Sequence, residues 1–237
     1  MIFVCRIILL LSLLAIGGCA SNGKLVDLEK DNDPFETINR KVFVFNEKFD
    51  QYIGKPVARG YVKVLPVKIR RSIRNFLGNL AEPLTIINDL LQGKFTRALQ
   101  DSGRFVANST IGLFGLFDVA TYFQLEKNSE DFGQTFARWV FAEGPYLVLP
   151  FLGPSTIRDG LGLVPHYVWT DPAQYVGSEN TRIGYWTINL ISKRADLLAS
   201  SALLEMQLDP YIFLRESYRQ VRLNQIYDGD PPFEDDF

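Results

Sequence analysis

The chain has 237 residues, with 25 Lys and Arg against 27 Asp and Glu, which gives a formal net charge of −2. This balance lacks the basic field that is typical of nucleic-acid-binding proteins, so we expect no nucleic-acid partner. A single histidine and two cysteines are too few to suggest a zinc site or a disulfide framework. Mean hydropathy is +0.02, which is high for an exported soluble domain. Either the core is unusually aromatic, or part of the surface faces lipid.

The first residues have the pattern of an export signal. Arg6 precedes an apolar run over 7–16, and small residues then lead to Cys19 in an Ile-Gly-Gly-Cys sequence that is similar to a lipobox. The run is too short for a comfortable membrane span. We therefore expect residues 1–18 to be a lipoprotein signal peptide, with palmitate-type acylation of Cys19 by a diacylglycerol and an N-acyl chain. Residues 19–32 would form a flexible tether. An uncleaved anchor helix or an ordinary signal peptide is the alternative.

Helical patterns dominate the rest of the chain. Asp33 is a good N-cap for a first helix, which Gly54 and Pro56 would end. Its apolar residues alternate at spacings of three and four and form one stripe, made of Phe35, Ile38, Val42, Phe45, Phe49 and Tyr52. The Glu82-Pro83 pair indicates the start of another helix, which Gly93 would close, and a further helix is expected over Lys94–Asn108. Strand-like alternation between hairpin turns is scarce, so we predict an all-α fold.

Two apolar stretches lack a clean helical period. Residues 105–125 contain Asp118 as their only charge, and residues 144–157 contain none. Three prolines argue against a helix in the second stretch. We expect both stretches to dip into a membrane or to form buried, non-helical loops, and an aromatic core loop is the alternative. The second is also our candidate gating or membrane loop, through Gly144, Pro145, Tyr146, Leu147, Pro150, Phe151 and Gly153.

A long helix is predicted over Glu179–Met206. A narrow polar stripe lies inside its wide apolar arc, and its members are the candidate channel-lining residues Thr187, Arg194, Ser201 and Glu205. Polar groups flanked by apolar ones should be paired or should line a wet passage. Arg194 could therefore also pair with a carboxylate on a neighbouring helix. Asp209-Pro210 should cap a final helix, and residues 229–237 form an acidic tail that we expect to be disordered.

The sequence offers little catalytic chemistry. Ser155 and His166 lie eleven residues apart, but no GxSxG nucleophile elbow exists, and Ser155 is better explained as a helix cap. We find no phosphate-binding loop and no dinucleotide fingerprint, and we expect no cofactor and no metal. A membrane-proximal lipase that uses Ser155 stays the least favoured function.

Several long motifs then give a resemblance to a known family. In chain order they are DPFETINR (33–40), NFLGNLAEP (75–83), LLQG (90–93), RFVANSTIG (104–112), DFGQTF (131–136), GPYLVLPFLGPSTIRD (144–159) and DPYIFLRESYRQ (209–220). Because of these motifs the chain resembles the VacJ/MlaA family of outer-membrane lipoproteins, and the resemblance covers a body of about residues 33–228. The resemblance implies a ring-like α-helical body anchored in the inner, periplasmic leaflet of a Gram-negative outer membrane. It also implies an amphipathic channel through the body.

The resemblance implies non-enzymatic lipid transport as well. Phospholipids that reach the outer leaflet would pass through the channel to a soluble periplasmic phospholipid-binding carrier, and this would maintain lipid asymmetry. A trimeric outer-membrane porin is the second expected partner. The alternative from a different class is a structural lipoprotein that assists porin assembly and transports no lipid.

Overall fold

The computed structural model describes residues 33–175 and 178–232. The chain divides into units 1–31 and 32–237, and all of the described residues lie in the second unit. Its elements in chain order are α2 (Glu36–Phe49), η1 (Asp50–Gly54), α3 (Lys55–Val64), α4 (Val67–Leu91), α5 (Phe95–Thr110), η2 (Ala120–Phe123), α6 (Phe132–Arg138), β1 (Tyr146–Leu149), β2 (Gly153–Thr156), α7 (Ile157–Pro165), η3 (His166–Thr170), η4 (Pro172–Tyr175), α8 (Glu179–Asp196), α9 (Leu198–Glu205) and α10 (Pro210–Ile226).

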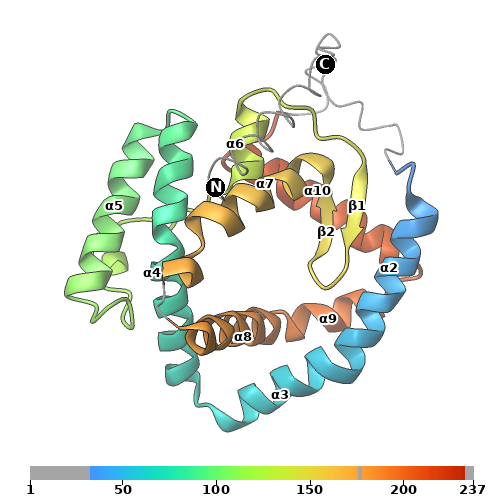
Figure 1. Cartoon of the computed structure of the whole chain (residues 1–237), viewed down its shortest axis with the longest axis horizontal. Coiled ribbons are helices and arrows are strands. Elements are labelled where there is room, and N and C mark those ends of the chain that lie inside the picture. The colour runs from blue at the N-terminus through green and yellow to red at the C-terminus, as the bar shows by residue number, and fades with distance from the viewer. Residues whose placement is uncertain (1–32, 176–177, 233–237) are drawn as a thin grey trace. The chain divides into compact units, whose positions relative to one another are not determined.

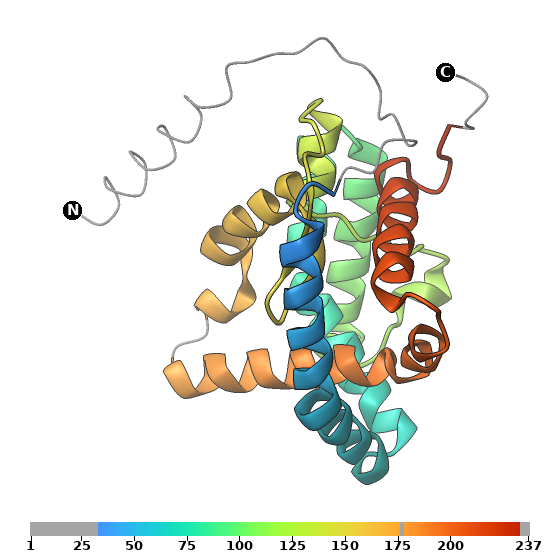
Figure 2. The same cartoon turned by 90° about the vertical axis from the view of Figure 1, so that its right-hand side faces the viewer.

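These elements contact one another in a closed order. From α2 the contacts pass through η1, α3, α8, α4, α6 and α7 to β2, and β1 then returns to α2 (Figure 1). α8 runs across the direction of α2 and α10, as Figure 2 shows. This circuit of mostly helical elements, which the β1–β2 hairpin closes, confirms the predicted ring-like, α-helical class. Within the described residues, no helix is both long enough and apolar enough to cross a membrane.

The first helix differs from the prediction at both ends. α2 begins at Glu36, and Asp33 does not cap it. Asp33 is buried instead, where it accepts hydrogen bonds from Asn39 and from the Tyr211 hydroxyl. At the other end, one π-helical turn (η1) leads directly into α3. Pro56 did not end the helix, because a proline in the first turn of a helix has no intrahelical hydrogen bond to lose.

α4 is also longer than predicted. It starts at Val67 and runs through Pro83, which is inside the helix and not at its start. A proline inside a helix removes one backbone hydrogen bond. Here residues on both sides of it, Asn79 and Thr85 among them, are buried, and α4 packs along α5. α4 thus continues as one helix through Pro83.

The proline-rich stretch forms a β-hairpin. β1 pairs with β2 in antiparallel fashion, with Tyr146 opposite Thr156 and Leu149 opposite Gly153. The prediction of a non-helical segment is therefore confirmed, whereas the scarcity of strand patterns concealed this pair. Pro154 lies in β2, where a two-stranded ribbon leaves one side of the strand unpaired. Phe151 at the turn has φ of +63°, and Gly153 has φ of +85°.

Burial in this fold is inverted relative to a soluble protein. Among the described residues, twenty-two buried side chains are polar or charged and nine are apolar, while forty-four large apolar side chains are exposed. In α2 the residue that is buried is Asn39, whereas Phe35, Ile38 and Phe45 of the predicted apolar stripe are exposed. In α5 the buried residues include Asp101 and Arg104, and Leu99 is 75% exposed. Much of the apolar surface of these helices is therefore exposed, although Val42 of the α2 stripe packs against the small buried cluster.

Candidate functional site

Arg194 on α8 forms an ion pair with Asp50 on η1. Its Nε lies 2.5 Å from Asp50 Oδ1 and its Nη2 lies 2.8 Å from Asp50 Oδ2, so the guanidinium binds the carboxylate with two parallel hydrogen bonds. Arg194 Nη2 also donates to Ser201 Oγ at 2.8 Å. The side chains of Arg194 and Asp50 are only 17% and 22% exposed. The sequence left two possibilities for Arg194, an ion pair with a carboxylate or a place along a wet passage. The structure contains the ion pair.

Lys55 extends this network to α9. Its Nζ lies 2.5 Å from Glu205 Oε1 and 3.8 Å from Asp50 Oδ2. Lys55 lowers the pKa of Glu205, and the two groups join α3 to α9. We refer to Asp50, Lys55, Arg194, Ser201 and Glu205 as the Arg194 cluster. Its charges sum to zero, with two carboxylates facing two cations.

The structure brings together three of the four residues predicted to line a channel. Arg194, Ser201 and Glu205 belong to the Arg194 cluster, even though the expected single helix is divided at Leu197 into α8 and α9. Thr187 lies two turns before Arg194 and is exposed. Asp50 and Lys55 were missed. The sequence feature that marks them is a pair of opposite charges, five residues apart, beside an otherwise apolar helix stripe. That feature alone does not predict a pairing with Arg194.

The β-hairpin is fastened along one face of α2. Asn39 donates to the carbonyl of Tyr146 and accepts from the amide of Val148. Asn46, seven residues later and therefore on the same helix face, donates to the carbonyl of Leu149 and accepts from the amide of Phe151. Each asparagine thus replaces the strand partner that β1 lacks on that side.

The base and the tip of the hairpin differ in burial. Tyr146 and Val148 are buried with Tyr211 in the small apolar cluster of the fold. At the tip, Phe151 is 59% exposed and contacts Phe49 edge-on, with ring centroids 4.9 Å apart. Gly144 has φ of +71° just before β1, and a Cβ there would lie 3.1 Å from Ile157 Cβ. The hairpin therefore has a fixed base and an exposed apolar tip.

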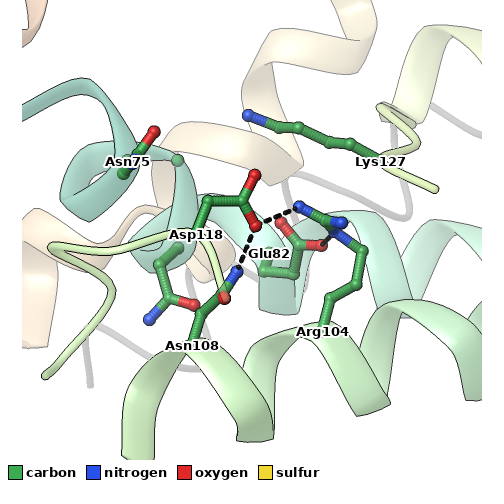
Figure 3. Close-up of a pocket in the computed structure, with 8 residues that line it drawn as sticks. Asn75, Glu82, Arg104, Asn108, Asp118 and Lys127 are labelled. Atoms are coloured by element: carbon green, nitrogen blue, oxygen red, sulfur yellow. Dashed lines mark hydrogen bonds and ion pairs between the residues drawn. The ribbon is translucent and has the colours of Figure 1, made fainter. Parts of the chain in front are cut away.

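A polar pocket lies between α4 and α5 (Figure 3). Arg104 approaches Glu82 at 3.6 Å and Asp118 at 3.0 Å, and Asn108 also donates to Asp118. Burial raises the pKa of Glu82 to about 7, and Asp101 adds to this rise while Arg104 opposes it. The cavity has a volume of about 10 Å³, close to the minimum for one water molecule. It is too small for a lipid, so we assign it no lipid-binding role.

The residues of the lipase alternative do not form a catalytic pair. Ser155 lies in β2 and donates to the carbonyl of Thr156, and it is Thr156 that caps α7 by accepting from the amide of Asp159. The residue that caps α7 is therefore Thr156, one position after the predicted cap, Ser155. His166 begins η3, and its Nδ1 is buried without a partner. Among residues 33–175 and 178–232, no cluster of three or more metal-ligating side chains occurs. The predicted lipidation site, Cys19, lies outside the described residues.

Comparison with known proteins agrees with this architecture. The family model for "MlaA lipoprotein" matches residues 31–225. The intermembrane phospholipid transport system lipoprotein MlaA of Escherichia coli (strain K12) is 37% identical over 224 residues, covering 89% of this chain and 86% of the relative. Its counterpart in Haemophilus influenzae is 32% identical, and the match covers 93% of this chain and 89% of that relative. An uncharacterized protein of Rickettsia typhi, RT0044, is 34% identical, and the match covers 87% of this chain and 81% of that relative.

A solved structure from work headed "Structural basis for maintenance of bacterial outer membrane lipid asymmetry" superposes with a TM-score of 0.72 at 34% identity, covering 84% of this chain and 99% of that one. The family model spans well over half of the chain, and these relatives align with 87–93% of it. The chain belongs to the MlaA lipoprotein family.

Proposed function

We propose that this protein carries phospholipids out of the outer leaflet of the outer membrane through a passage in its helical body. As a member of its family, it is a non-enzymatic intermembrane phospholipid transport lipoprotein that maintains outer-membrane lipid asymmetry. The passage, its lining and its direction are our proposal. The observation that carries it is the inverted burial, with polar side chains inside and large apolar side chains outside.

The exposed apolar residues favour a body that lies within a lipid monolayer. Leu99, Val106 and Phe114 on α5 and the segment after it are 75%, 58% and 76% exposed. Soluble monomers avoid large apolar patches because water contact costs about 25 cal/mol per Å² of apolar area. In lipid this cost disappears, and residues 33–175 and 178–232, in which no helix could span a membrane, can rest in one leaflet. We place it in the inner, periplasmic leaflet of the outer membrane, anchored through Cys19.

The energetics of lipid transfer explain why a passage is needed. Moving a phospholipid with roughly thirty methylenes into water without shelter would cost on the order of 20 kcal/mol of free energy, at about 0.8 kcal/mol for each methylene. Its charged headgroup meanwhile needs polar partners in an apolar zone. We propose that the Arg194 cluster, together with Thr187, offers such partners along the passage. Because its charges are paired, the cluster can bind a headgroup phosphate transiently without leaving a bare cation in lipid.

We propose further that the hairpin tip gates the passage. Support comes from the fixed base at Tyr146 and the exposed tip at Phe151, between glycines with positive φ at 144 and 153. Replacing Asn46 with Ala removes both hydrogen bonds that hold the tip to α2. We expect faster amide exchange at Leu149–Gly153 and altered transport, measured by hydrogen exchange and by surface phospholipid. Unchanged transport with a mobile tip would refute the gating role.

The partners follow from the same chemistry. Among the described residues we find no phosphate-binding loop, so direction must come from lipid imbalance and from a partner that accepts the lipid. We propose a soluble periplasmic phospholipid carrier in that role, and a trimeric porin beside the apolar exterior.

The experiment compares cells that lack this protein with cells that contain it. An impermeant amine-reactive reagent labels phosphatidylethanolamine in the outer leaflet, and porin abundance is measured in parallel. We expect surface phospholipid to rise severalfold on deletion, with porin abundance unchanged. Changed porin levels without surface phospholipid would favour the porin-assembly function instead. Release of free fatty acid that depends on Ser155 would favour the lipase.

A further inference from the structure

A second cavity lies at the start of α8, away from the Arg194 cluster. It has a volume of about 240 Å³ and is lined by Tyr167, Asp171, Ala173, Gln174, Arg182 and Trp186. This volume is below the roughly 300–1,000 Å³ that is usual for pockets enclosing a drug-sized molecule. The cavity can therefore hold a small polar group, but not a pair of acyl chains.

Asp171 is a buried carboxylate for which the described residues provide no cationic partner. Its side chain belongs to a residue that is only 2% exposed, and Oδ1 accepts the amide hydrogen of Ala173 at 2.9 Å. Within the described part of the chain, no lysine or arginine forms an ion pair with it. His166 cannot supply the charge, because burial lowers its pKa and keeps the ring neutral near pH 7. A carboxylate in this position is costly unless a cation approaches it.

Aromatic rings also line this cavity. The ring centroids of Tyr167 and Trp186 lie 5.0 Å apart, and the His166 ring contacts Tyr167 at a tilt of 57°, with centroids 4.8 Å apart. Burial and the charge of Asp171 raise the pKa of Tyr167, so its phenol stays neutral. Faces of tyrosine and tryptophan attract an ammonium group, and a nearby carboxylate adds to that attraction.

Arg182 supplies the opposite charge. It also lines the cavity, its side chain is exposed, and among the described residues no carboxylate pairs with it. A guanidinium forms strong, two-point hydrogen bonds with phosphate oxygens. The lining thus combines a carboxylate and two aromatic rings with a guanidinium that pairs with no carboxylate among the described residues, which matches a group that carries an ammonium and a phosphate close together.

We propose that this cavity binds the zwitterionic headgroup of an ethanolamine phospholipid, with the ammonium against Asp171, Tyr167 and Trp186 and the phosphate against Arg182. The assignment rests on the proposed lipid-transport function and adds to it a preference for headgroup. A phosphatidylglycerol headgroup has no cation for Asp171. The same chemistry in a water-soluble compound, such as glycerophosphoethanolamine, is the competing source.

Lipid binding to the full-length lipidated protein in detergent micelles tests the proposal. Native mass spectrometry counts bound phosphatidylethanolamine and phosphatidylglycerol supplied in equal amounts. We expect the wild type to bind the ethanolamine lipid about fivefold or more in preference. Asp171→Asn should abolish that preference, because the amide oxygen still caps η4 while the charge is lost. Arg182→Gln should weaken binding of both lipids, and Glu179→Gln, on the same helix outside the cavity, should change neither.

The outcomes separate this proposal from the function on which it rests. Equal binding of the two lipids by the wild type, or a preference that survives Asp171→Asn, would overturn the headgroup site and leave transport untouched. Failure of the wild type to bind either lipid would contradict the transport function as well. Glycerophosphoethanolamine that binds as strongly as the lipid would assign the cavity to a soluble compound and overturn the lipid assignment.

Discussion

Replacing Arg194 with Leu separates the energetic role of the Arg194 cluster from its role in transport. The change removes two hydrogen bonds to Asp50 and one to Ser201. An exposed ion pair contributes about 0–1 kcal/mol, whereas loss of one partner of a buried pair costs about 3–5 kcal/mol. With side chains 17% and 22% exposed, we expect an intermediate loss of about 2 kcal/mol in the free energy of unfolding. In a body of this size, that lowers Tm by roughly 4–8 °C.

A double-mutant cycle measures this coupling. We expect Arg194→Leu combined with Asp50→Leu to be less destabilised than the sum of the single variants by about 1–2 kcal/mol, since the unpaired carboxylate is removed. Thermal unfolding in micelles gives the energies, and outer-leaflet amine labelling in cells gives transport. Lys193→Leu, an exposed neighbour on α8, is the matched control. Strictly additive energies, or normal lipid asymmetry with Arg194→Leu, would refute the reasoning.

Two other changes test charges outside the proposed passage. Glu82 binds a proton more tightly in the folded state, with its pKa raised from 4.5 to about 7, so stability should fall as pH rises through that window, by about 3 kcal/mol. Glu82→Gln should flatten this dependence and raise Tm at pH 8; a steeper dependence would contradict it. Arg222, which is buried and pairs with Asp131 at 2.7 Å and Asp159 at 2.9 Å, joins α10 to α6 and α7. Arg222→Met should lower the free energy of unfolding by about 3–5 kcal/mol, and a loss below 1 kcal/mol in denaturant titrations would show that the pairing is not structural.

Helical periodicity predicted which residues share a face but not which face is buried. In α2, the spacing of Phe35, Ile38 and Phe45 identified one stripe, and such a stripe ordinarily faces a core. In this fold these three side chains are exposed, and Asn39 is buried instead. Which face of a helix is buried depends on its surroundings, because an apolar face needs no protein covering where lipid surrounds it. High hydropathy together with a lipidation signal was the sequence observation that pointed to such surroundings.

The structural features that could not be predicted from the sequence depend on contacts between residues that lie far apart in the chain. Asp33 is a strong N-cap by its type, yet Tyr211 and Asn39 bind it, so the local preference yields to a buried network. Arg194 was recognised as requiring a partner, but its partner Asp50 lies 144 residues away. The hairpin at residues 146–156 forms because Asn39 and Asn46 complete its hydrogen bonds from α2, and no strand pattern records this.

The most direct test of the account is a map of what surrounds each face. A nitroxide label placed at Leu99, on the exposed apolar face of α5, or at Ser201, in the Arg194 cluster, reports access to oxygen and to a water-soluble nickel chelate. In the lipidated protein reconstituted in bilayers, we expect Leu99 to be accessible to oxygen and shielded from the chelate. Ser201 should show the reverse. Equal access of the chelate to both positions would mean that the apolar exterior faces water, and it would contradict a body that rests in a monolayer with a polar passage inside.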